Sequence, residues 1–254
     1  MNNYSLLQKG LHHLALSSQF MREVTFDFEM SNSSHKFGDD NNIFIAGIAR
    51  SGTTILLNAF YKSDIFASLT YKDMPFVLAP NIWSKLSFNT KNTDWVPRAH
   101  DDGIQVSTES PEALEEVFWK TFKKQDNETI DKFRTYVLLI NHRYKKNRYL
   151  SKSNQNIKRL DFIRKIFPNS KILIPFRDPL QQAYSLLNQH KKFLKNSKED
   201  KFISRYMEWI GHSEFGSQYI PIYKENLQYI DNANINHWLE QWLLAYGNIL
   251  NSQS

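Results

Sequence analysis

The sequence predicts a three-layer α/β fold, in which helices flank a central parallel sheet. Two strand–loop–helix series, one beginning near residue 43 and one near residue 149, support this prediction. Strands of a parallel sheet read as short apolar runs, and each is joined to the next by a crossover that is usually a helix. The chain has 254 residues, of which 41% are hydrophobic and 14% aromatic. It can therefore bury a core of its own.

The first series follows a polar, turn-rich stretch at residues 32–42. Ile43–Ile48 (IFIAGI) is a continuous apolar run that ends in a glycine-containing turn, which is typical of a buried parallel strand. Ile55–Tyr61 (ILLNAFY) then has helical character. We accordingly expect an N-terminal helical and loop extension at residues 1–42, and a single α/β domain at residues 43–254.

The second series begins with Tyr149–Lys152 as a short strand. Asn154–Phe167 follows, with apolar residues three and four positions apart on one helical face. Lys171–Phe176 (KILIPF) is the next predicted strand. Asp178 is a suitable N-cap with a proline at the first helical position, so we expect a helix from there towards Phe193.

Two further stretches are predicted to be helical. Glu109–Gln125 is amphipathic and is opened by Ser110-Pro111-Glu112. The C-terminal third is rich in Trp and Tyr and also has helical character.

Composition and charge exclude several classes of protein. The chain has no Cys, which excludes disulfide scaffolds, thiolate zinc sites and a Cys nucleophile. The net charge of +6 suits an anionic partner, but no nucleic-acid-binding signature accompanies the basic patches, so we expect no nucleic acid partner. No apolar run is long enough for a transmembrane helix, and the N-terminus does not resemble a signal peptide, so we expect a cytoplasmic protein.

Gly47–Thr54 (GIARSGTT) has the glycine spacing of a phosphate-binding loop, with the required strand before it and helix after it. Such a loop cradles an anion with backbone N–H groups at the helix N-terminus. The usual Lys is replaced by Thr53, and Arg50 supplies a cation from inside the loop. We therefore expect the loop to bind a phosphate-type anion without turnover of ATP·Mg²⁺. A turn that binds no ligand is the alternative for the motif taken alone.

Two more cations follow predicted strands. Lys152 ends one strand, and Arg177 follows another, eight residues before Ser185. Ligands of parallel α/β sheets bind at the carboxyl ends of the strands, where Arg50 is also expected. Taken singly, Lys152 is compatible with an ordinary surface residue and Arg177 with an ion pair to Asp178. A ligand with two separated anionic groups would account for all three cations.

Together these residues resemble the sulfotransferase family that uses 3′-phosphoadenosine 5′-phosphosulfate (PAPS), and most closely its bacterial and carbohydrate-type branch. The resemblance implies a P-loop NTPase-like architecture and transfer of a sulfuryl group from PAPS to a hydroxyl or amine of a saccharide, lipid or small metabolite. No metal is implied. It implies catalytic roles for Arg50, Lys152 and Asp73. The implied cofactor-binding residues are Gly47, Arg50, Ser51, Gly52, Thr53, Thr54, Arg177 and Ser185.

The sequence departs from the family pattern at two places. Asn154 stands where cytosolic members carry a catalytic His. Tyrosylprotein-type members use a Glu past the loop Arg, so Asp73 is the expected general base, with His100 and Glu109 in reserve. The family's closing strand and its Gly- and Lys-bearing loop are not seen, so we expect the C-terminal part of the family domain to be missing. A non-catalytic nucleotide-binding protein and a P-loop kinase are the alternatives.

Overall fold

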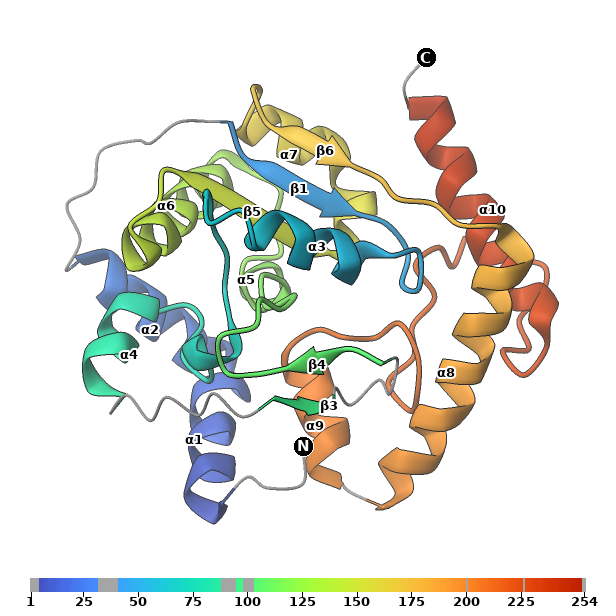
Figure 1. The fold of residues 1–254 in the computed structure, drawn as a ribbon, viewed down its shortest axis with the longest axis horizontal. Helices are drawn as coiled ribbons and strands as arrows, with labels where there is room; N and C mark the ends of the chain where they lie inside the picture. The colour runs from blue at the N-terminus through green and yellow to red at the C-terminus, as the bar shows by residue number, and fades with distance from the viewer. Residues whose placement is uncertain are drawn as a thin grey trace.

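The predicted parallel sheet is present. The computed structural model describes residues 5–31, 41–87, 95–97, 103–199, 201–225 and 227–252. Four parallel strands lie in the order β2–β5–β1–β6 (Figure 1). They are β1 (Ile43–Ala46), β2 (Phe66–Ala67), β5 (Arg148–Ser153) and β6 (Lys171–Leu173). A separate antiparallel pair is formed by β3 (Val96–Pro97) and β4 (Gln105–Val106).

The strand register brings the predicted site segments to one edge of the sheet. Ile45 of β1 lies opposite Lys152 of β5 on one side and Leu173 of β6 on the other. The loops that leave the carboxyl ends of these three strands therefore start next to each other.

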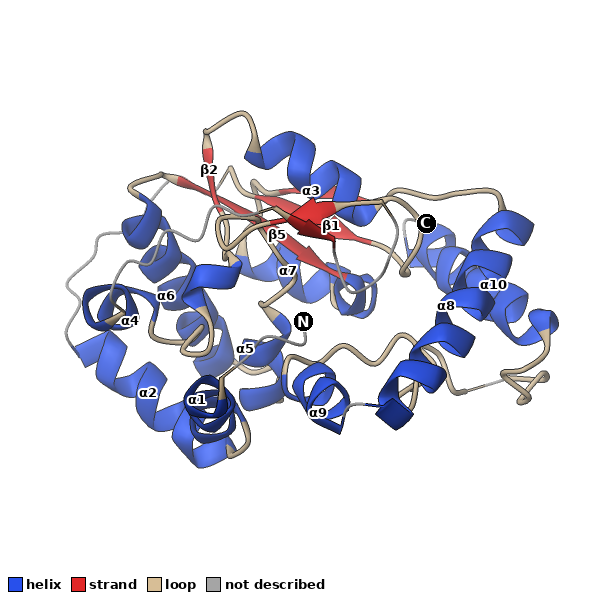
Figure 2. Ribbon diagram, turned by 60° about the horizontal axis from the view of Figure 1, so that its bottom comes forward, coloured by secondary structure: helices blue, strands red, loops and turns tan. Residues whose placement is uncertain are grey.

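Helices cover both faces of the sheet (Figure 2). Ile43 and Ile45 pack in one hydrophobic cluster with Leu57, which belongs to α3. Phe44 points to the other face, where its ring lies 6.4 Å from Phe133 and 5.8 Å from Phe167. This alternation gives the three layers that the sequence predicts. The helices concerned are α3 (Thr53–Tyr61), α5 (Glu116–Thr121), α6 (Asn127–Tyr144) and α7 (Leu160–Ile166).

The N-terminal helices pack against the same core. They are α1 (Leu6–Leu16) and α2 (Gln19–Ser31), and α2 contacts α4 (Pro80–Leu86). Phe26 is fully buried, 5.8 Å from the ring of Phe118. The carboxylate of Glu29 accepts hydrogen bonds from the backbone N–H groups of Asn81 (2.9 Å) and Ile82 (3.0 Å), so it caps the start of α4.

The C-terminal part is helical, as predicted, with irregular segments between the helices. It contains α8 (Pro179–Glu199), α9 (Lys201–Trp209) and α10 (Ile235–Ser252). Asp178 caps α8 by accepting from the Gln181 N–H at 2.9 Å, which confirms the expected helix start. Helices α8 and α10 lie side by side beyond the β6 edge of the sheet (Figure 1).

Several element boundaries differ from the prediction. The helix expected at Glu109–Gln125 is limited to α5, because residues 110–112 bond instead to the segment after β2, with Glu112 N–H donating to Leu69 O at 3.0 Å. The helix expected at Asn154–Phe167 is divided into the 3₁₀ helix η2 (Asn154–Lys158) and α7. Strand β6 ends at Leu173, shortly before Pro175, which has no N–H to donate to a ladder.

One helix was not predicted, and one expected loop falls largely outside the described residues. Helix α6 was not predicted from the sequence. Most of the loop expected at residues 32–42 lies outside the described residues.

Candidate functional site

The phosphate loop connects β1 to α3 through residues 47–52. Arg50 (φ 70°) and Gly52 (φ 100°) both adopt left-handed backbone conformations, which turn the chain into the helix. Gly52 is the N-cap residue of α3 and provides no side-chain hydrogen bond. The helix dipole favours negative charge at this N-terminus, where no N-cap side chain is present.

Gly47 allows a close approach of two segments. A Cβ atom at this position would lie 3.2 Å from Ser51 Oγ and 3.3 Å from the carbonyl oxygen of Pro175. The loop thus packs tightly against the chain that continues from β6. The first glycine of the motif is required for this packing.

Helix α8 supports the loop from the side. Gln182 Nε2 donates to the carbonyl oxygens of Ala49 (2.9 Å) and Ile48 (3.3 Å). Arg50 Nε donates to Ser185 Oγ at 3.0 Å. The structure therefore brings together the loop and the Ser of the second motif, which lie 135 residues apart in the sequence.

Lys152 enters the same cavity as Arg50. Its side chain is nearly buried, with 5% of the residue exposed. The cavity at the carboxyl edge of the sheet has a volume of about 30 Å³ and is lined by Ala49, Arg50, Thr53, Thr54, Lys152, Asn154, His212, Glu214 and Phe215. Two of the three expected cations thus meet at the N-terminus of α3.

Glu214 contributes the carboxylate of this cavity and was missed by the sequence analysis. Its Oε1 accepts a hydrogen bond from Asn154 Nδ2 at 2.7 Å, while Asn154 Oδ1 lies 3.5 Å from Thr53 Oγ1. Glu214 is buried on the irregular segment after α9, which no local motif marks. Only the tertiary fold brings this carboxylate to the phosphate loop.

Arg177 lies at the edge of the site. Its side chain is exposed, and Nε and Nη2 both lie 3.3 Å from Gln181 Oε1. It is not among the residues that line the cavity of Arg50 and Lys152. Helix α10 holds its backbone, because Trp242 Nε1 donates to Arg177 O (3.2 Å) and the Tyr246 hydroxyl donates to Pro175 O (2.8 Å).

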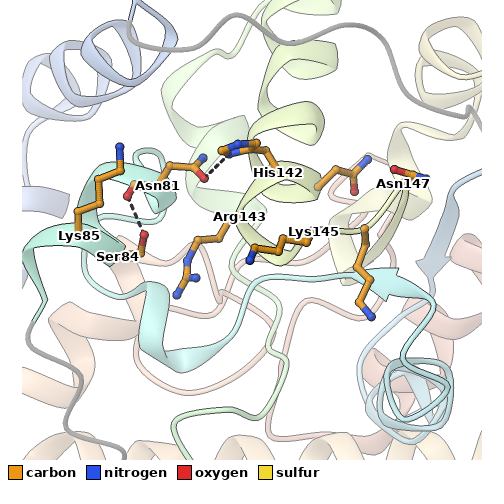
Figure 3. Close-up of a pocket in the computed structure, with 9 residues that line it drawn as sticks. Asn81, Ser84, Lys85, His142, Arg143, Lys145 and Asn147 are labelled. Carbon is orange, nitrogen blue, oxygen red and sulfur yellow. Dashed lines mark hydrogen bonds between the residues drawn. The ribbon is translucent and has the colours of Figure 1, made fainter.

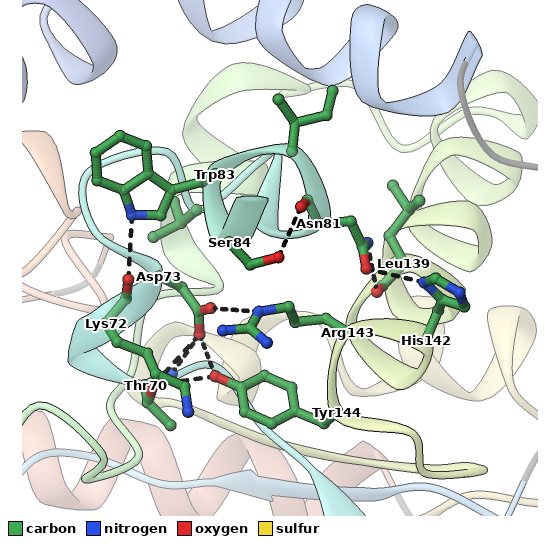
Figure 4. Close-up of polar contacts among 12 residues, drawn as sticks. Thr70, Lys72, Asp73, Asn81, Trp83, Ser84, Leu139, His142, Arg143 and Tyr144 are labelled. Atoms are coloured by element: carbon green, nitrogen blue, oxygen red, sulfur yellow. Dashed lines mark hydrogen bonds and ion pairs between the residues drawn. The ribbon is translucent and has the colours of Figure 1, made fainter. Parts of the chain in front are cut away.

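Asp73 occupies a different, buried environment (Figure 4). It ends the 3₁₀ helix η1 (Tyr71–Asp73) and is 1% exposed. Its carboxylate accepts from Thr70 N (2.8 Å) and from the Tyr144 hydroxyl, and it lies 3.6 Å from Arg143 Nε. Burial raises the pKa of the Asp73 carboxyl, although these three partners lower it. Asp73 does not line the cavity of Arg50 and Lys152.

The two reserve candidates for the base fall elsewhere. Glu109 forms an ion pair with Lys72, and half of its side chain is exposed. His100 lies outside the described residues.

The described residues lack two further kinds of feature. They contain no group of three or more His, Cys, Asp or Glu side chains placed to hold a metal ion. Within the same part of the chain, no helix combines the length and hydropathy needed to span a bilayer.

Comparison with known proteins identifies the family. The sequence matches the family model described as "Sulfotransferase family" over residues 42–238. The sulfotransferase STF1 from Mycobacterium tuberculosis is a similar solved structure, with 12% identity, a TM-score of 0.48 and coverage of 84% of this chain and 71% of that one. The sulfotransferase STF9 from Mycobacterium avium has 12% identity, a TM-score of 0.42 and coverage of 96% and 78%. No curated protein matches the sequence.

The matched range includes the phosphate loop, the strand that ends in Lys152, the segment with Arg177 and Ser185, and the start of α10. It spans most of the 254 residues. This chain is therefore a member of the sulfotransferase family.

Proposed function

We propose that this chain is a cytoplasmic, PAPS-dependent sulfotransferase that transfers a sulfuryl group to a hydroxyl or amine acceptor. A saccharide, a lipid or a small metabolite is the expected acceptor. One observation carries the proposal: Arg50 and Lys152 line a single cavity at the N-terminus of α3, and Arg50 is bonded to Ser185 of the second motif.

The residues of the site fit an anionic cofactor. Gly47 leaves space for the loop to close, and the loop places Ser51, Gly52, Thr53 and Thr54 at the start of α3. PAPS would supply the activated sulfuryl group. Arg50, Lys152 and the loop N–H groups would stabilise the negative charge that develops on the departing phosphate. Arg177 and Ser185 would hold the 3′-phosphate, with Arg177 turning away from Gln181 to do so.

The cavity itself has room for about one water molecule, since its volume is about 30 Å³. A nucleotide would therefore either extend beyond this cavity or displace the lining segment with His212, Glu214 and Phe215. This segment contains Gly211 and Gly216, both with positive φ angles. It would then form one wall of the opened site.

Two carboxylates are candidates for the base that takes the acceptor's proton. Asp73 is the candidate from the sequence. Glu214 is supported by its position, because it lies in the same cavity as the two cations and is held by Asn154. Asn154 stands at the position where cytosolic members carry the catalytic His. The hydrogen bond from Asn154 therefore keeps the Glu214 carboxylate close to that position. Replacement of the true base by its amide should lower turnover and preserve cofactor affinity.

Calorimetric titration with adenosine 3′,5′-bisphosphate in the absence of metal tests the proposal. We expect binding that is lost in Arg50→Ala and preserved in Lys165→Ala, an exposed Lys on α7. Acceptor classes are then screened with PAPS. Absence of binding by folded protein contradicts the cofactor assignment, and binding of ATP·Mg²⁺ alone indicates a kinase. Binding without transfer to any acceptor indicates a non-catalytic nucleotide-binding protein.

A further inference from the structure

A second, larger cavity lies between α4 and the end of α6 (Figure 3). Its volume is about 540 Å³, and nine residues line it: Asn81, Ser84, Lys85, Asn141, His142, Arg143, Lys145, Lys146 and Asn147. We propose that this pocket, called here the α4–α6 pocket, binds a phosphate or sulfate group of a small molecule. The inference does not depend on the proposed function of the phosphate loop.

The position of the α4–α6 pocket separates it from the phosphate loop. Helix α6 ends at Tyr144 and β5 begins at Arg148, so lining residues 145–147 lie at the amino end of β5. Lys152 lies at the other end of the same strand. A ligand in this pocket therefore does not occupy the cavity of Arg50 and Lys152.

The charge of the lining favours an anion. Four of the nine residues are Lys or Arg, and none is Asp or Glu. Lys146 is paired with Asp64, at 2.8 Å from Oδ1, whereas Lys85 and Lys145 are exposed. Ammonium and guanidinium groups form strong, charge-assisted hydrogen bonds to phosphate and sulfate oxygens.

Arg143 is held in position before any ligand arrives. Its Nε lies 3.6 Å from Asp73 Oδ1, and its guanidinium lies 5.3 Å from the centre of the Tyr144 ring (Figure 4). Thr70 and Tyr144 in turn fix Asp73. Because the ion pair uses Nε, the two Nη groups can be directed at an oxyanion. A preorganised side chain loses less conformational entropy on binding.

The polar wall of the pocket is also fixed. His142 Nδ1 lies 2.9 Å from Asn81 Oδ1, which joins α6 to α4, and Ser84 Oγ donates to Asn81 O at 2.7 Å within α4. Asn141 forms part of the same wall and is 6% exposed.

The test is a titration followed by backbone amide chemical shifts at constant ionic strength. The probes are inorganic phosphate, inorganic sulfate, glucose 6-phosphate and glucose 6-sulfate, with glucose as the neutral control. We expect the anionic probes to shift the amides of residues 145–147 in the wild type and in Arg50→Ala. The double variant Lys85→Ala/Lys145→Asn should bind at least tenfold more weakly. Asn is chosen at position 145 because Lys145 has a φ of 53°, which Asn tolerates.

The double variant Lys165→Ala/Lys171→Ala is the matched control, because it removes two exposed Lys residues that do not line the pocket. Its affinity should equal that of the wild type. Tighter binding of the sugar esters than of the inorganic ions supports an ester ligand, and equal binding supports a free oxyanion. The proposal is overturned if the two double variants bind equally, if shifts are confined to residues 47–54, or if Arg50→Ala abolishes them.

Discussion

The phosphate loop and the α4–α6 pocket are built in different ways. In the loop, one continuous segment between β1 and α3 presents backbone N–H groups, and Arg50 and Lys152 add charge. In the α4–α6 pocket, side chains from α4 and from the end of α6 provide the charge, and Asp73 supports Arg143 from a third segment. The loop is a product of local sequence, whereas the pocket is a product of tertiary structure. Substitutions should therefore affect the two regions differently.

The largest expected effect is on catalysis at the loop. Arg50→Ala and Lys152→Ala each remove a positive charge that the proposed mechanism directs at the reacting group, which we expect to lower turnover by about 10²–10³-fold. The rate of sulfuryl transfer from PAPS to an acceptor found in the screen is the measurement. Lys165→Ala is the control and should transfer at the wild-type rate. Unchanged turnover in both Arg50→Ala and Lys152→Ala would show that the chemistry takes place elsewhere.

A smaller effect is expected on the stability of the loop. Gly47→Ala places a methyl group against Ser51 and the Pro175 carbonyl, so we expect a loss of about 1–3 kcal/mol in the free energy of unfolding. Urea unfolding measures it. Gly10→Ala is the matched control, since nothing lies within 4 Å of a Cβ in that position of α1. It should stabilise the protein by about 0.5–1 kcal/mol. Equal effects of the two substitutions would exclude the close approach at Gly47.

The buried carboxylate of Asp73, beside the α4–α6 pocket, should make the stability of the protein depend on pH. Burial gives Asp73 a higher pKa in the folded chain than in the unfolded chain, so the folded state binds more protons between these two values. Stability of the wild type should then fall as pH rises above about 4, by about 1.4 kcal/mol for each unit of pKa difference. Asp73→Asn lacks this titration.

The stability of Asp73→Asn relative to the wild type should therefore increase with pH. Urea unfolding between pH 4 and pH 8 measures this difference. Asp161→Asn provides the exposed control, because 83% of the Asp161 side chain is accessible. If the stability of Asp73→Asn relative to the wild type instead decreases with pH, Arg143 and Tyr144 lower the pKa of Asp73 more than burial raises it.

The smallest expected effect is at the contact between the two motifs. Ser185→Ala removes the acceptor of the Arg50 Nε hydrogen bond, and it should weaken binding of adenosine 3′,5′-bisphosphate by about 3–10-fold, or roughly 1 kcal/mol. Calorimetric titration gives the affinity. Ser204→Ala is a suitable control, since Ser204 lies on α9 and bonds to Ser217 at 3.1 Å. A loss as large as that of Arg50→Ala would mean that Ser185 contributes more to nucleotide binding than one neutral hydrogen bond.

The parts of the molecule that were predicted correctly have local signals. The strand at Ile43 and the helix cap at Asp178 depend on residues within a few positions of each other, and the parallel sheet follows from their order. The helix expected at Glu109–Gln125 was too long because residues 110–112 pair with the segment after β2, a contact that periodicity cannot show.

The same distinction applies to the candidate site. The loop glycines and Arg50 form a pattern in the sequence, and they were found. Glu214 reaches Asn154 from 60 positions away, and the α4–α6 pocket combines segments that are also far apart. No spacing of residues in the sequence indicates either Glu214 or the α4–α6 pocket. The functional roles of the site residues remain predictions for the experiments above.

The hydrogen bonds from α10 to the segment after β6 have a consequence for the order of events during synthesis. Trp242 and Tyr246 donate hydrogen bonds to the carbonyl groups of Arg177 and Pro175. Trp242 is synthesised 65 positions after Arg177, and Tyr246 is synthesised 71 positions after Pro175. The ribosome completes the phosphate loop and Arg177 well before it reaches either residue. The edge of the proposed nucleotide site therefore cannot reach its final form on a nascent chain until α10 has emerged and docked.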